Sequence, residues 1–114
     1  MDQAIVVLKA LSDKNRLRII KMLQIKPMCV CEIREVLGLA NSTTSKHLSI
    51  LKSADLIFEK RENKWINYYL NQTTQQKYSK EMLELIEKWI ENDPLIINDR
   101  TKVEGVDRFN ICNR

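Results

Sequence analysis

The chain has 114 residues, of which 44% are hydrophobic, and it carries 19 Lys and Arg against 15 Asp and Glu. A chain of this length forms one modest domain, and pairing with a second copy is a natural source of further buried surface. No apolar run reaches the roughly 18 residues needed to cross a bilayer, and the first residues lack a basic signal region, so we expect a cytoplasmic protein without a membrane partner.

The positive charge is concentrated in the first part of the chain. Residues 1–65 hold 12 Lys and Arg and 7 Asp and Glu, a balance of +5, whereas residues 66–114 hold 7 and 8, a balance of −1. This distribution favours a protein that turns one basic face toward a polyanion such as DNA.

Two helices are expected first. Residues 2–11 are apolar on almost every side of a helix, which indicates burial on two sides. Ser12 or Asp13 is placed to cap a second helix, which has apolar residues at helical spacing and ends before Pro27. The basic side chains of this second helix are expected to face water: Lys14, Arg16, Arg18 and Lys21.

A helix-turn-helix is expected next. A short third helix spans about residues 29–37, and Gly38 is placed to close it. Asn41 is placed to cap a fourth helix that extends to about Ala54. Two short helices joined through a glycine-containing turn form the helix-turn-helix signature.

A β-hairpin and a fifth helix follow. Residues 56–60 and 65–70 are rich in aliphatic and aromatic side chains and flank the charged tetrapeptide 61–64, which is typical of a hairpin with a basic tip. Residues 78–90 predict an amphipathic helix with a wide apolar face, and the Asp-Pro pair at 93–94 ends it.

The remaining residues, 95–114, show no clear period, and we expect a loosely packed or partner-dependent tail. The expected fold is mainly α with a small β-hairpin, a homodimeric winged helix-turn-helix of about five helices. In this organisation residues 1–92 form the DNA-binding and dimerisation domain, and residues 93–114 form a C-terminal tail.

The fourth helix and the hairpin carry the residues expected to read DNA. On a helical wheel Thr44, Leu48 and Leu51 share one face, whereas small hydroxyl side chains and one cation lie opposite. Such a surface can approach the major groove closely, although an isolated helix of this composition is more often a solvated face. Its position between a glycine turn and a basic hairpin favours DNA binding. The expected contacts are Asn41, Ser42, Thr43, Ser45, Lys46, His47, Ser49, Arg61 and Lys64.

His47 and two aromatic residues of the hairpin each have two possible interpretations. His47 falls at the edge of the core face, where a packed, hydrogen-bonded histidine and a phosphate contact are equally compatible with the pattern. Trp65 and Tyr68 are expected to pack the hairpin rather than to stack on bases.

Several segments carry a family resemblance, namely residues 8–13 with 16–19, 29–33, 45–51 and 64–70. With these segments, the chain resembles over residues 5–90 the ArsR family of winged-helix metalloregulatory repressors. The resemblance implies a homodimer joined through its first and last helices, which binds a palindromic operator and represses transcription until an inducer binds. It also implies half-sites about one turn of DNA apart.

Cys29 and Cys31 stand where arsenic sensors of this family have a Cys-Val-Cys box. Thiolates are soft ligands, so the resemblance implies trivalent arsenic or antimony as the inducer. These ions favour three thiolates, but Arg34 occupies the position of the further cysteine that is frequent in the box. The third ligand is either Cys112 or a non-protein oxygen or thiol.

The spacing of the two cysteines also predicts a mechanism. Residues i and i+2 of a helix point about 200° apart, so one ion bound by both thiolates must distort the start of the third helix. Because that helix is half of the DNA-reading motif, inducer and operator would oppose each other's binding.

Several alternatives remain at this stage. The two thiols can be inert, or they can respond to oxidation rather than to a metalloid. Zinc is less favoured, since the last helix has no histidine, and no cysteine precedes Cys29 to supply the N-terminal ligands of cadmium and lead sensors. A winged helix that binds only protein is a further class. One histidine, no glycine-rich phosphate loop and no Cys-x-x-Cys motif leave almost nothing for catalysis, so we expect no enzyme.

Overall fold

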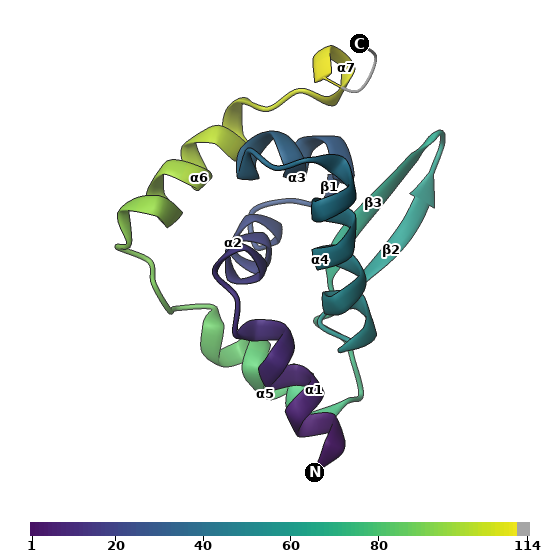
Figure 1. Ribbon diagram of the computed structural model, residues 1–114, viewed down its shortest axis with the longest axis vertical. Helices are drawn as coiled ribbons and strands as arrows, with labels where there is room; N and C mark the ends of the chain where they lie inside the picture. The colour runs from purple at the N-terminus through teal and green to yellow at the C-terminus, as the bar shows by residue number, and fades with distance from the viewer. Residues whose placement is uncertain (112–114) are drawn as a thin grey trace.

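A computed structural model describes residues 1–111 of the chain, and Figure 1 shows a group of helices with a β-hairpin extending along one side of it. The expected fold class is confirmed, because the described part is mainly helical and carries a β-hairpin next to a helix-turn-helix. The elements in chain order are α1 (Asp2–Leu11), α2 (Lys14–Leu23), β1 (Met28–Cys29), α3 (Val30–Leu37), α4 (Asn41–Ser53), β2 (Ile57–Glu62), β3 (Trp65–Leu70), α5 (Lys77–Ile86), α6 (Pro94–Gly105) and α7 (Arg108–Ile111).

Helix α2 lies at the centre of the molecule (Figure 1). Of the two expected caps, Asp13 is the one used: its carboxylate accepts the backbone N–H groups of Asn15 at 2.8 Å and Arg16 at 3.1 Å. The expectation that Arg18 and Lys21 face water is wrong, since only 9% and 4% of their surfaces are exposed. Both are buried because each finds polar partners on later helices.

The turn between α3 and α4 forms as expected around Gly38. Gly38 has φ 74°, and its N–H donates to the carbonyl oxygen of Arg34 at 2.8 Å. The expected cap of the next helix is shifted by one position, because Ala40 is the capping residue and Asn41 is the first residue of α4. The Ala40 carbonyl accepts both the N–H and the hydroxyl of Thr44, at 3.0 and 2.9 Å.

Replacing Gly38 by alanine is expected to lower the free energy of unfolding by about 1–2 kcal/mol, the typical cost of a left-handed backbone for a residue with a Cβ. An added Cβ meets no atom within 4 Å, so the cost is conformational only. Gly105→Ala is the matched control: it also meets no atom within 4 Å and ends a right-handed helix. The control should be neutral or about 0.4–1 kcal/mol more stable. Urea unfolding measures both, and equal midpoints for the two variants would contradict the prediction.

The sheet has three antiparallel strands in the order β1-β3-β2. The hairpin of β2 and β3 confirms the expected wing. Strand β1 was not expected, and it pairs Cys29 with Asn67 of the wing. Cys29 therefore has an extended backbone, φ −87° and ψ 169°, and only Cys31 is helical. The expectation of two cysteines on one helix is wrong, because β3 pairs with the backbone of Cys29 before α3 begins.

Helix α5 ends at Ile86, earlier than the expected end at residue 90. Lys21 terminates it: the buried ammonium donates to the carbonyl oxygens of Ile86 at 3.2 Å and Glu87 at 3.1 Å. Residues 87–92 form turns instead, and Ile90 has φ 53°.

Helix α6 overturns the expectation of a loosely packed tail for residues 94–105. Asp93 caps it, and Ile96, Asp99 and Val103 are buried against the neighbouring helices α2 and α3. Asp99 is held by Arg18, with Nε–Oδ2 2.8 Å and Nη2–Oδ1 2.9 Å. A charged residue in the buried stripe explains why no hydrophobic period was visible. The division into residues 1–92 and 93–114 stays a prediction, and Cys112 lies outside the described residues.

Within residues 1–111, no helix combines the length and the apolar character that crossing a membrane requires.

Candidate DNA-reading face and cysteine site

The outer surface of α4 carries most of the residues expected to read DNA. The expected inner face is confirmed, since Thr44, Leu48 and Leu51 are at most 1% exposed. The exposed side chains of the first two turns are small hydroxyls, one amide and one cation, namely Asn41, Ser42, Thr43, Ser45 and Lys46. No acidic residue lies in α4, so this surface is free of charges that repel phosphate.

Ser49 is exposed as well, but it lies beside another helix. With Ile50 it lines a groove that Val6 and Lys9 of α1 and Arg16 of α2 complete. The structure therefore separates Ser49 from the cluster at the start of α4 and places it where α1 meets α4.

His47 is partly buried between these two surfaces. Its Nδ1 lies 3.2 Å from Nη1 of Arg16, in the first turn of α2. Of the two interpretations of His47, the structure shows the hydrogen bond, and a phosphate contact stays a prediction.

The wing presents two exposed cations near its tip, Arg61 at the end of β2 and Lys64 in the turn. Glu62 stiffens this end of the hairpin by accepting hydrogen bonds from the Tyr69 hydroxyl and from Asn67 Nδ2. The hydrogen bond from Tyr69, with that from Asn67, lowers the pKa of Glu62, and the same bond to Glu62 raises the pKa of Tyr69. Hydrogen bonds among polar side chains of the hairpin therefore hold the two strands together next to the basic tip.

The aromatic side chains of the wing pack, as expected. Tyr68 packs against the hydrophobic core. Trp65 makes an edge contact with Phe109 of α7, with ring centroids 6.0 Å apart. Two cations flank the indole: Lys64 Nζ lies 5.0 Å and the Arg108 guanidinium carbon 5.3 Å from its centroid.

The cysteines stand at the junction of β1 and α3. Cys29 is 4% exposed, and its backbone N–H donates to Oε1 of Glu32 at 3.0 Å. Cys31, two residues on, is partly exposed. Within residues 1–111, no group of three or more His, Cys, Asp or Glu side chains is arranged to hold a metal ion. The described part of the site therefore offers two thiols to a soft ion.

Sequence reasoning missed two residues beside the thiols. Glu32 is 4% exposed, and its carboxylate also accepts from Nη2 of Arg108 at 2.8 Å. Glu32 was detectable, because a glutamate three residues after the capping residue is the mark of a capping box. Nothing in the local pattern pointed to Arg108, which lies 76 positions later. Through Glu32 and Trp65, this arginine joins the cysteine segment to the wing.

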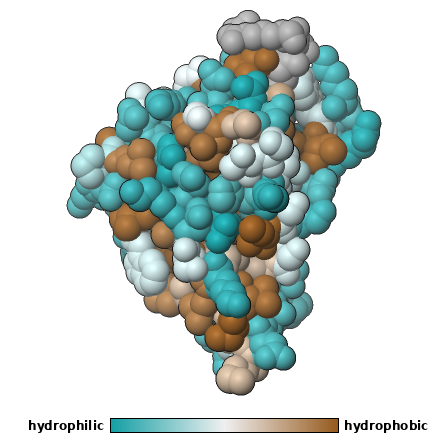
Figure 2. All heavy atoms as spheres, in the orientation of Figure 1, coloured by the Kyte–Doolittle hydropathy of each residue, from teal (hydrophilic) through white to brown (hydrophobic). Residues whose placement is uncertain are grey.

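A separate surface is strongly apolar. Large hydrophobic side chains remain 40–53% exposed on α1, on α5 and in the turn after α5: Ile5, Val6, Leu8, Leu85, Trp89 and Ile90. The two helices pack together at one end of the molecule (Figure 1), where hydrophobic side chains also gather in Figure 2. Apolar patches of this kind mark interaction surfaces.

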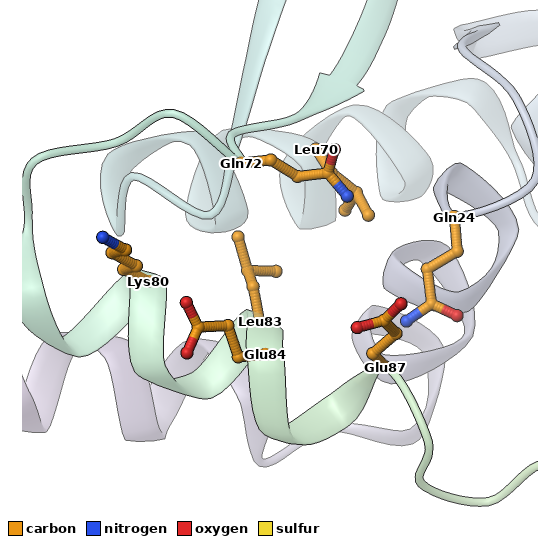
Figure 3. Close-up of a pocket in the computed structure, with 7 residues that line it drawn as sticks. All are labelled: Gln24, Leu70, Gln72, Lys80, Leu83, Glu84 and Glu87. Carbon is orange, nitrogen blue, oxygen red and sulfur yellow. The ribbon is translucent and has the colours of Figure 1, made fainter.

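A small pocket lies between the end of α2, the end of β3 and α5 (Figure 3). Leu70 and Leu83 form its apolar side, and Gln24 and Glu87 lie close together at one end of it. Its other lining residues are Gln72, Lys80 and Glu84. The lining contains no cysteine or histidine, so this pocket is separate from the thiol site.

Comparison with known proteins agrees with this geometry. Residues 13–58 match the family model described as bacterial regulatory protein, arsR family. The chain is 37% identical over 82 residues to the transcriptional repressor SdpR of Bacillus subtilis, covering 72% of this chain and 91% of SdpR. It is 31% identical over 68 residues to the arsenical resistance operon repressor of Escherichia coli, covering 59% of this chain and 58% of that repressor.

A solved structure shows the same fold. The homodimeric winged helix-turn-helix DNA-binding domain of Mb0332 from Mycobacterium bovis superposes with a TM-score of 0.64 at 28% identity. The match covers 75% of this chain and 76% of the Mb0332 domain.

Proposed function

The chain belongs to the arsR family of bacterial regulatory proteins, and from this premise we propose that it is a homodimeric repressor that releases its operator when trivalent arsenic or antimony binds. The observation that carries the DNA-binding part is the outer surface of α4, where small polar side chains and Lys46 face solvent. The wing lies alongside α4 (Figure 1), so Arg61 and Lys64 extend the same surface toward the phosphates.

The apolar surface of α1 and α5 supports the dimer. Side chains such as Leu8 and Leu85, each more than half exposed, gain burial when a second copy covers them. The homodimeric Mb0332 domain is in keeping with this. A two-fold dimer presents two copies of α4 to half-sites about one turn of DNA apart.

Cys29 and Cys31 are the proposed inducer ligands, with Cys112 as the third. Their thiolates fit the preference of a soft metalloid. Two observations on the residues before it motivate this choice: Arg108 of α7 donates to the Glu32 carboxylate, which also accepts from the N–H of Cys29, and Ile111 is buried. A trivalent ion held by these thiolates would draw the segments that carry them toward one another.

Release of DNA follows from the place of these ligands in the fold. Cys29 belongs to β1 and Cys31 to α3, so a chelate across them shifts the junction that Glu32 caps. Helix α3 packs directly on α4, and a shift of α3 displaces the exposed first turns of α4. The inducer and the operator therefore weaken each other's binding by the same factor.

Thiol oxidation is the second candidate switch. It is favoured by the partial exposure of Cys31 two residues from Cys29, because exposed thiols are the ones that oxidants reach. Oxidation would act on the same cysteines and release the same surface of α4 and the wing, so it differs from metalloid binding only in the chemical signal.

A titration of the protein on DNA tests the proposed function. A fluorescent duplex, selected by this protein from a random pool, is followed by anisotropy at several salt concentrations. We expect the affinity for DNA to fall steeply with salt. A plot of the logarithm of the association constant against the logarithm of the salt concentration should steepen by about 0.9 for each phosphate contacted. A shallow slope contradicts DNA reading and favours a winged helix that binds protein.

The same assay then separates the two signals. Stoichiometric arsenite should release the duplex without an oxidant. Release by peroxide alone, reversed by dithiothreitol, identifies oxidation as the signal and contradicts the metalloid proposal. Zinc serves as the harder control ion and should have little effect.

A further inference from the structure

Arg16 ties three helices together through a single guanidinium group. Its Nε donates to the carbonyl oxygen of Ala10 at 2.7 Å and its Nη2 to that of Lys9 at 3.2 Å, both at the end of α1. Its Nη1 reaches His47 on α4 at 3.2 Å. The two hydrogen bonds to α1 thus fix the position of the guanidinium group that contacts the imidazole.

The chemistry of the pair determines which nitrogen of His47 carries the proton. A guanidinium is always protonated and has only donors, so Nδ1 must accept. A neutral imidazole with an accepting Nδ1 carries its hydrogen on Nε2. Among residues 1–111, Nε2 has no hydrogen-bond partner, which leaves its N–H available to a ligand outside the chain.

The charged groups around the imidazole keep this arrangement together. Oδ2 of Asp13, the capping residue of α2, lies 3.9 Å from Nη1 of Arg16. Burial raises the pKa of Asp13, but the N–H and the charge of Arg16, with smaller effects of His47 and of the Asn15 N–H, together lower it, so the carboxylate stays charged. Lys9 of α1 lines the same groove as Arg16, and Lys46 directly precedes His47 in α4; both lysines are exposed. Asp13 therefore balances Arg16, and the guanidinium remains free to donate to His47.

We propose that Arg16 is a positioning residue that holds His47 in its Nε2–H form, so that His47 donates a neutral hydrogen bond to a DNA phosphate. The proposal rests on the proposed function, since it explains how His47, one of the expected DNA contacts of α4, is oriented. It adds a residue of α2 that does not itself need to touch DNA. His47 sits between the core face and the exposed face of α4, next to the exposed Lys46.

Nitrogen NMR of the wild-type protein tests the first half directly. The chain has one histidine, so the imidazole signals need no assignment. At a pH where the ring is neutral, we expect a protonated Nε2 and an unprotonated Nδ1. The Arg16→Gln variant should shift toward a mixture of both forms. A wild-type ring protonated on Nδ1 overturns the proposal without any variant.

A double-mutant cycle on DNA affinity tests the second half. Arg16→Gln and His47→Ala should each weaken binding to the selected duplex by about tenfold, typical of a lost hydrogen bond to a charged group. If Arg16 acts through His47, the double variant is no weaker than His47→Ala alone. The salt slope should stay unchanged, because neither residue contributes a charge at a phosphate.

The control is Lys14→Gln, which removes a cation from the same turn of α2 without a contact to His47. Circular dichroism confirms that each variant is folded at the assay temperature. Additive losses in the double variant, or an equal loss in Lys14→Gln, overturn the role of Arg16. If the wild type binds no DNA, the proposed function fails instead, and the NMR result still decides the state of His47.

Discussion

The double variant Cys29→Ser, Cys31→Ser is expected to bind operator DNA as tightly as the wild type and to stay bound when arsenite is added. Serine removes the soft thiolates while leaving side chains of similar size, and neither cysteine lies in α4 or in the β2–β3 hairpin, which carry the expected DNA contacts. Wild-type affinity should fall by about 5–150-fold at saturating arsenite, the usual range of such couplings, whereas the variant should change less than about twofold. Anisotropy of a labelled duplex measures both.

Cys112→Ser is the companion variant, and it reports on the third ligand. A strongly reduced response identifies Cys112 as a ligand, and a normal response assigns the third position to a non-protein group. Full arsenite-driven release in the double variant would show that the two thiols are not the sensor. A double variant that cannot bind DNA before arsenite is added would instead give the cysteines a structural role.

Asp99→Ala is expected to lower the free energy of unfolding by about 3–5 kcal/mol, because it leaves the buried guanidinium of Arg18 without its charged partner. Asp99 is 2% and Arg18 9% exposed, and two hydrogen bonds of 2.8 and 2.9 Å join them. The other partners of Arg18 are uncharged, namely Asn15 and the carbonyl of Val36. A loss of this size is a large share of the about 5–15 kcal/mol that stabilises a typical domain.

Arg100→Ala is the matched control for this prediction. Arg100 follows Asp99 in α6 and pairs with Glu91 at 2.5 Å, but both side chains are about 40% exposed. Its loss should cost less than about 1 kcal/mol, as is usual for exposed ion pairs. Urea unfolding followed by circular dichroism measures each variant. The prediction fails when the midpoints of Asp99→Ala and Arg100→Ala are the same.

The helix-turn-helix and the wing were predictable because their signals are local. Gly38 marks the turn through a backbone conformation that suits glycine, and aromatic and aliphatic runs flank the basic tip of the hairpin. The inner face of α4 follows from the spacing of Thr44, Leu48 and Leu51 alone.

The parts that were missed depend on partners distant in the sequence. Strand β1 is two residues long and exists because β3 offers it a free edge. Helix α6 buries an aspartate, so its inner stripe does not register as hydrophobic. Arg108 belongs to the cysteine site because α7 packs beside α3, a contact that the sequence does not reveal. A buried ion pair interrupts the hydrophobic pattern of an element, so a prediction based on hydrophobic periodicity misses it.

The Arg18–Asp99 pair also has a consequence for synthesis on the ribosome. Helices α3 and α4 are complete by residue 53, but the aspartate that neutralises Arg18 lies 81 positions after it in the chain. At about 5–20 residues per second, the nascent chain spends several seconds with that arginine unmatched. Helices α2, α3 and α4 therefore gain the stability of this buried pair only after residue 99 has been synthesised, well after their own residues.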